Sequence, residues 1–144
     1  MATIEVVAAN PTEFSAAQSF YELRGYGGAA IESSDFVVLA KRMDRIVGVG
    51  RLCQEGDLLW LRGMQVEPEL QRQGVGTRIL HMLGQEIGTR ACYCLPYGHL
   101  VSFYQKAGFR PASGPLAPAM EDRLASYLHR GLNVVAMLRA AVTA

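Results

Sequence analysis

Residues 68–80 read PELQRQGVGTRIL, with Gly74 and Gly76 standing two apart directly before an apolar periodic run. Behind the glycines, apolar residues recur every four positions, at Val75, Ile79, Leu83 and Ile87. This spacing predicts an amphipathic helix that ends at Gly88. The first N–H groups of a helix have no intrahelical partner and lie at the positive end of the helix dipole. The stretch is therefore suited to holding a phosphate or pyrophosphate group.

Two common nucleotide-binding motifs are excluded by the residues in this stretch. A Rossmann fingerprint needs a third glycine where Ile79 stands, and a P-loop needs Lys and then Ser or Thr after its last glycine. Here Gly76 is followed by Thr77 and Arg78. An alternative without any ligand stays open, in which the two glycines only permit a positive φ before the helix.

The composition describes an ordinary globular chain. Its 144 residues, half of them hydrophobic, predict one domain over residues 1–144 with a real core. Lys and Arg number 14 against 13 Asp and Glu, a balance that gives no reason to expect a nucleic-acid or membrane partner. Because there is no 18-residue apolar run and no signal-peptide pattern at the start, we expect a cytoplasmic protein.

The three cysteines do not indicate a metal or redox site. Cys53, Cys92 and Cys94 lack the C-x-x-C spacing of zinc and redox motifs. We expect them to be small buried side chains, and we predict no metal.

The hydrophobic pattern along the chain alternates between strand-like and helix-like segments. Strands are predicted at 3–9, in a hairpin over 36–52, and at 57–66, 90–95 and 132–138. Helices are predicted at 11–25, 75–88, 99–108 and 118–131, and 110–118 (RPASGPLAP) is predicted to be a loop. This order predicts an α/β fold built on a mixed sheet.

A second motif, FYQKAGF at residues 103–109, follows the glycine stretch at a distance of about thirty residues. Together, the two stretches resemble the GNAT superfamily of acyl-coenzyme A-dependent N-acyltransferases. Gln71, Gly74 and Gly76 fit the Gln/Arg-x-x-Gly-x-Gly/Ala pattern of that family in order, and Tyr104 falls on the tyrosine of its Phe-Tyr-x-x-x-Gly-Phe pattern. The resemblance is close from about Ile46 to Phe109.

The resemblance implies a GNAT-like sandwich and a cosubstrate, acetyl-coenzyme A (acetyl-CoA). Its central, mostly antiparallel twisted sheet would have about seven strands flanked by helices, with the fourth and fifth strands splayed apart around the pantetheine arm. Two groups of residues would hold the cofactor through their backbones. The first group, Met64, Gln65 and Val66, would contact the pantetheine amides, and the second, Gln71, Arg72, Gln73, Gly74, Val75, Gly76 and Thr77, would surround the pyrophosphate.

The reaction that the resemblance implies is acetyl transfer to a primary amine of a small molecule or protein. Tyr104 would be the general acid, and a backbone N–H near Gln65 or Val66 would polarise the thioester carbonyl. Relatives that use a strand glutamate as base carry it where Trp60 stands here. His99 and Glu32 are the candidate bases, and an ordered water is an equal alternative.

The acceptor site would lie around residues 20–32, where Tyr21, Tyr26 and Phe36 are candidates for an aromatic wall. Many relatives also carry an Asn where Tyr97 stands. This departure leaves open a non-catalytic module of the same fold that senses acyl-CoA or regulates a partner. The segment after Pro118 is a candidate homodimer interface.

Overall fold

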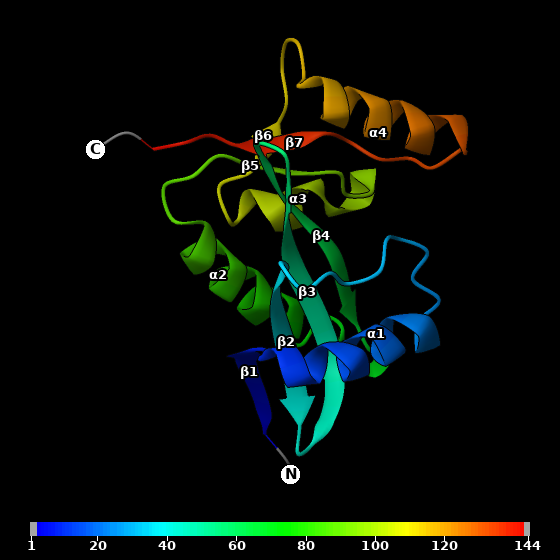
Figure 1. Ribbon diagram of the computed structural model, residues 1–144, viewed down its shortest axis with the longest axis vertical. Coiled ribbons are helices and arrows are strands. Elements are labelled where there is room, and N and C mark those ends of the chain that lie inside the picture. The colour runs from blue at the N-terminus through cyan, green and yellow to red at the C-terminus, as the bar shows by residue number, and fades with distance from the viewer. Residues whose placement is uncertain (1–2, 143–144) are drawn as a thin grey trace.

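The computed structural model describes residues 3–142, which form one seven-stranded sheet with helices on both faces (Figure 1). The strands are β1 (Ile4–Ala8), β2 (Phe36–Arg42), β3 (Arg45–Glu55), β4 (Leu58–Val66), β5 (Cys92–Cys94), β6 (Arg110–Pro111) and β7 (Met137–Arg139). Their order in the sheet is β1-β2-β3-β4-β5-β7-β6. Neighbouring strands run antiparallel except β4 and β5, which are parallel. The predicted mixed α/β fold with about seven strands is confirmed.

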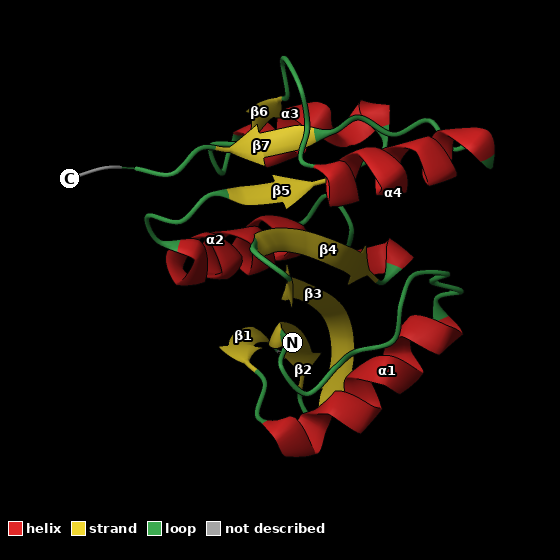
Figure 2. Cartoon of the chain, turned by 45° about the horizontal axis from the view of Figure 1, so that its top comes forward, coloured by secondary structure: helices red, strands yellow, loops and turns green. Residues whose placement is uncertain are grey.

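The helices divide between the two faces of the sheet (Figure 2). They are α1 (Phe14–Leu23), α2 (Val75–Ile87), α3 (Val101–Gln105) and α4 (Pro118–His129), with short 3₁₀ turns at Pro11–Glu13, Pro68–Leu70 and Gly98–Leu100. Successive strand residues point to opposite faces. Val38 and Ala40 therefore pack in the core under α2 and α3, whereas Val37 and Leu39 pack under α1. On the α1 side, Trp60 and Met120 of α4 form a third cluster.

Two features of the C-terminal part differ from the sequence-based prediction. The strand expected at 132–138 is only Met137–Arg139, because the β5–β7 ladder is interrupted at Pro96, which has no N–H to donate, and continues beyond it only as an isolated bridge between Tyr97 and Val134. The preceding residues make only scattered bonds, such as Val135 N–H to the Pro96 carbonyl at 2.9 Å. The loop expected at 110–118 also contains β6, a two-residue strand that ends on Pro111 and is too short to leave a pattern.

Strands β4 and β5 share a single pairing, between Trp60 and Tyr93. Beyond that point they separate, as the predicted splay requires. No helix within residues 3–142 is long and apolar enough to cross a membrane.

Candidate active site

A cavity of about 390 Å³ opens where β4 and β5 separate, and we call it the β4–β5 cavity. It is lined by residues 25–28 of the loop after α1, 60–65 of β4, 94–97 at the end of β5, Leu100, Tyr104 of α3, and Tyr127, Arg130, Leu132 and Val134 of α4 and the segment after it. The gap between the two strands passes through the sheet, so elements on both faces of the sheet contribute walls to the cavity.

The shape of β4 beside the cavity depends on Gly63. This residue has a φ of +70°, and the register between β3 and β4 shifts beside it. A Cβ on Gly63 would lie 2.2 Å from the Tyr21 hydroxyl, which donates a hydrogen bond of 2.7 Å to the Gly63 carbonyl. Only glycine fits this bulge. Since β5 does not pair with β4 beyond Trp60, the β4 edge at Met64 and Gln65 borders the cavity without a strand partner among the described residues.

The turn at 71–76 begins α2 with left-handed backbone. Gly74, the residue that caps the helix, has φ +83°, and Arg72 has φ +67°. A Cβ at Gly74 would find no atom within 4 Å, so space is open beside the turn. The Gln71 side-chain amide donates a 2.9 Å hydrogen bond to the Val66 carbonyl, which fastens the turn to the end of β4. This arrangement suits an anion at the start of α2.

Gly76 has a different surrounding from Gly74. A Cβ there would lie 3.4 Å from the ring of Phe103, so the residue allows α2 to pack closely on α3.

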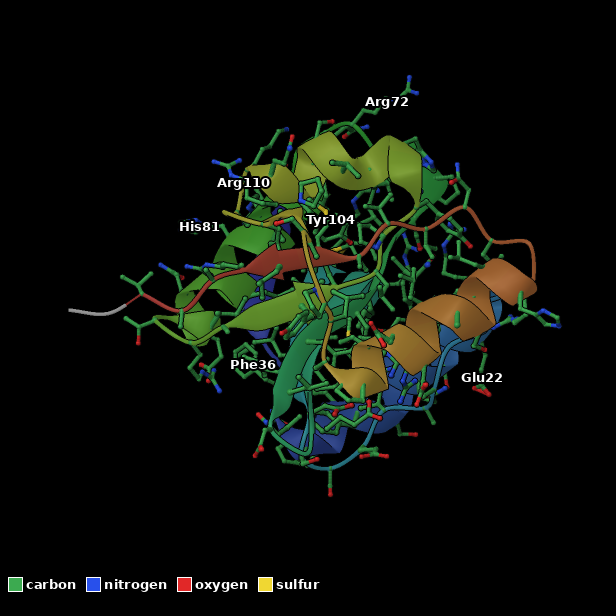
Figure 3. All side chains as sticks on the ribbon, turned by 90° about the horizontal axis from the view of Figure 1, so that it is seen from above. Glu22, Phe36, Arg72, His81, Tyr104 and Arg110 are labelled. Atoms are coloured by element: carbon green, nitrogen blue, oxygen red, sulfur yellow. The ribbon has the colours of Figure 1, made fainter. Side chains whose placement is uncertain are left out.

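Arg72 is exposed and lies at the rim of the molecule in Figure 3, whereas Tyr104 lies inside its outline.

Tyr104 lines the β4–β5 cavity from α3 and is only 6% exposed. Its ring meets Phe103 and Phe109 edge-on, with centroids 5.0 and 6.2 Å away, so its orientation is fixed by packing. Burial raises the pKa of the Tyr104 phenol above its usual value, and the phenol is protonated at neutral pH.

Comparison with known protein families agrees with the resemblance seen in the sequence. Residues 32–111, more than half of the chain, match the profile described as Acetyltransferase (GNAT) domain. The chain belongs to the GNAT acetyltransferase family. Among curated protein sequences no significant match is found.

Solved structures of GNAT enzymes share the fold at low sequence identity. The N-acetylglutamate synthase of Neisseria gonorrhoeae, in complex with coenzyme A and N-acetyl-glutamate, matches with a TM-score of 0.66 and 20% identity over 99% of this chain. The match covers 36% of that enzyme, so this chain spans about a third of its length. The ribosomal-protein-S18-alanine N-acetyltransferase of Escherichia coli matches with a TM-score of 0.70 and 14% identity, covering 99% of this chain and 96% of that one. An aminoglycoside 6′-N-acetyltransferase in complex with coenzyme A matches with a TM-score of 0.66 and 17% identity, and the match covers 97% of this chain and 98% of that one.

Neither candidate base lines the β4–β5 cavity of this GNAT domain. His99 is exposed and stacks on Tyr97 at a centroid distance of 6.0 Å, and it is not among the residues that line the cavity. Glu32 is exposed on the loop before β2, where its N–H bonds the Asp35 carboxylate at 2.9 Å. Their roles as bases stay predictions. Tyr97, the departure from the family pattern, does line the cavity.

The three aromatic candidates for an acceptor wall have different places. Tyr26 lines the cavity, and its ring lies against that of Tyr21 at 4.5 Å. Tyr21 itself belongs to α1 and is fully buried between that helix and the sheet. Phe36 packs with the core under α2 and is not a lining residue, and Figure 3 shows it well away from Tyr104.

Sequence reasoning missed the buried ion pair between Arg51 and Asp35, whose atoms are 2.8 Å apart. Arg51 is 1% exposed and also donates to the carbonyls of Ala29 and Ala30, so it holds the loop that leads into the cavity wall. It also missed Tyr127 and Arg130, which reach the cavity from the end of α4. No local pattern could identify these residues, because their partners lie far away in the sequence.

The expected burial of the cysteines is confirmed. All three are buried and free, and burial raises the pKa of Cys53 and of Cys92 to about 12. They are protonated thiols at neutral pH and poor nucleophiles.

Proposed function

We propose that this protein is an N-acetyltransferase that transfers the acetyl group of acetyl-CoA to a primary amine by direct attack in the β4–β5 cavity. The observation that carries the proposal is the placement of a buried, protonated Tyr104 on the wall of a cavity that opens between β4 and β5. The proposal draws further support from family membership and from relatives solved with coenzyme A.

In the proposed reaction, the neutral amine nitrogen attacks the thioester carbonyl carbon and the C–S bond breaks. The Tyr104 hydroxyl donates its proton to the departing sulfur, and the nitrogen releases a proton to water. The products are the N-acetyl amide and free coenzyme A. The Tyr104 phenolate regains its proton from solvent, so the balance is one acetyl group moved and one proton released when the amine enters as ammonium.

The cosubstrate would be held mainly by backbone groups. Met64 and Gln65 border the cavity beside the unpaired edge of β4, and we assign them to the pantetheine amides and the thioester carbonyl. Val66 is buried at the end of that strand and does not line the cavity. We assign it a positioning role, because its carbonyl accepts the hydrogen bond from Gln71 that holds the turn against β4. We assign the turn from Gln71 to Thr77 to the pyrophosphate.

The test is thiol release from acetyl-CoA, followed with a thiol reagent in the presence and absence of amines. Amine-dependent release with mass-spectrometric detection of the N-acetyl product is the expected result. Saturable binding of acetyl-CoA without release across small amines and peptides would instead establish the non-catalytic acyl-CoA-binding module. That alternative has its own support, since no carboxylate lines the cavity among the described residues.

A further inference from the structure

The β4–β5 cavity carries positive charge that no lining residue balances. Among the described residues that line it, Arg62 and Arg130 are the only charged side chains, and neither Asp nor Glu contributes to the wall. Arg62 comes from the middle of β4, on the sheet face covered by α1 and α4. Arg130 is exposed just after the end of α4.

Arg62 is held in place without an ionic partner. Its guanidinium carbon lies 4.0 Å from the centre of the Trp60 ring, so the stacked ring fixes the side chain. Within residues 3–142, no hydrogen bond or ion pair involves the Arg62 side chain, and its Nε is buried without an acceptor. A guanidinium carries five N–H donors, and leaving buried donors unpaired is costly.

The neighbouring arginines are neutralised and differ from Arg62 in this respect. Arg51, opposite Arg62 on β3, pairs with Asp35 at 2.8 Å. Arg123 also stacks on Trp60, with its guanidinium carbon 4.7 Å from the ring centre, but it pairs with Glu55 at 2.7 Å and does not line the cavity. Arg62 therefore lines the cavity with a guanidinium that is held in place by Trp60 and has no carboxylate partner among the described residues.

We propose that the acceptor is a free amino acid whose carboxylate binds Arg62, with its amine directed at the thioester. This inference rests on the proposed acetyl transfer and names its substrate class. A planar guanidinium matches a carboxylate through paired N–H donors. The same positive charge disfavours the ammonium form of a nearby amine, so it supplies neutral nucleophile in a cavity that has no carboxylate base.

The size of the cavity favours a free amino acid over a protein chain. At about 390 Å³ it is at the small end of ligand sites, and the thioester end of the cosubstrate takes part of it. Tyr26, in the loop after α1, and Tyr127, on α4, give the remaining space aromatic walls for an amino-acid side chain. Arg130 adds a second cation.

The first arm of the test compares acceptors of matched shape. The twenty common L-amino acids are assayed for thiol release, each beside its α-carboxamide and, where it exists, its decarboxylated amine. The inference expects the best acids to exceed their amides at least tenfold in kcat/KM, the ratio expected for a charge-assisted pair. Arg62→Gln should raise KM for the acid at least tenfold with little change in kcat or in KM for acetyl-CoA, and Arg62→Lys should restore part of the loss. Arg123→Gln is the matched control and should behave as wild type.

The second arm measures binding without turnover. Trp60 is the only tryptophan, and Arg62 stacks on it, so the emission of Trp60 reports on the site. With coenzyme A present, the best acid should change the emission saturably in wild type and in Arg123→Gln but not in Arg62→Gln, whereas the matched amide should not.

The outcomes separate the inference from the function. Equal transfer to acids and amides, or transfer only to peptides or to amines without a carboxylate, would overturn the amino-acid assignment while leaving acetyl transfer standing. If no amine is acetylated, the proposed function fails, and the emission titration alone decides whether Arg62 binds a carboxylate. No acid-dependent change in emission in wild type would then overturn the inference as well.

Discussion

Replacement of Gly74 by alanine separates the cofactor role of the turn from its role in folding. At φ +83° an L-residue is strained by about 1 kcal/mol, while the open space around the new Cβ adds no clash. For a chain of 144 residues the entropy of unfolding is about 0.3 kcal/mol per degree, so the strain alone lowers Tm by about 3 °C.

The effect on acetyl-CoA binding is larger if the turn holds the pyrophosphate. Acetyl-CoA at a hundred times its Kd stabilises wild type by about 2.7 kcal/mol, or about 9 °C. If the methyl group occupies the anion site and weakens binding a hundredfold, the same concentration gives Gly74→Ala only about 0.4 kcal/mol, or about 1 °C.

The assay is thermal unfolding of wild type and Gly74→Ala with and without acetyl-CoA. Gly56→Ala is the matched control, because Gly56 has φ +59° and open space in the β3–β4 turn. It should lose a similar amount of intrinsic stability and keep the full cofactor response. An undiminished cofactor shift in Gly74→Ala would refute the pyrophosphate assignment and leave the glycine as a requirement of the turn alone.

Two further predictions concern packing and ionisation. Gly63→Ala places a Cβ against the Tyr21 hydroxyl and should lower the free energy of unfolding, measured in urea, by about 2–4 kcal/mol. The double variant with Tyr21→Phe should lose at least about 0.5 kcal/mol less than the sum of the two single variants. Simple additivity of the two losses would refute the contact. Burial raises the pKa of Cys53 and Cys92 to about 12 in the folded state, so their contribution to stability is complete below pH 8.5 and is lost as pH rises toward 12. The fall in the free energy of unfolding above pH 8.5 should be shallower in Cys53→Ala/Cys92→Ala, and an equal slope in the two proteins would contradict the burial argument.

The sequence predicted those parts of the fold that local periodicity determines. The four-residue apolar spacing from Val75 to Ile87 is α2, and the two β-rich runs on either side of residues 41–45 (KRMDR) are the β2–β3 hairpin. The sequence-based predictions fail where contacts between distant segments determine the secondary structure. β6 has two residues and cannot show a period, and the early part of 132–138 fails as a strand because of Pro96, on a different segment.

The candidate site shows the same division. Gly74 and Gly76 were singled out by their spacing before a helix, and Tyr104 by the resemblance of FYQKAGF to the GNAT pattern. Gly63 requires Tyr21, 42 residues earlier, to explain it, and the unbalanced charge of Arg62 depends on which acids neutralise Arg51 and Arg123. Such features arise only when strands and helices distant in the chain are brought together.

The central claim is that acetyl transfer takes place in the β4–β5 cavity with Tyr104 as proton donor. The most direct measurement is kcat of Tyr104→Phe beside Tyr93→Phe, whose ring is on β5 but does not line the cavity. We predict that Tyr104→Phe loses about 10²-fold or more in kcat while still binding acetyl-CoA, and that Tyr93→Phe keeps its rate. Unchanged turnover in a folded Tyr104→Phe would contradict the account.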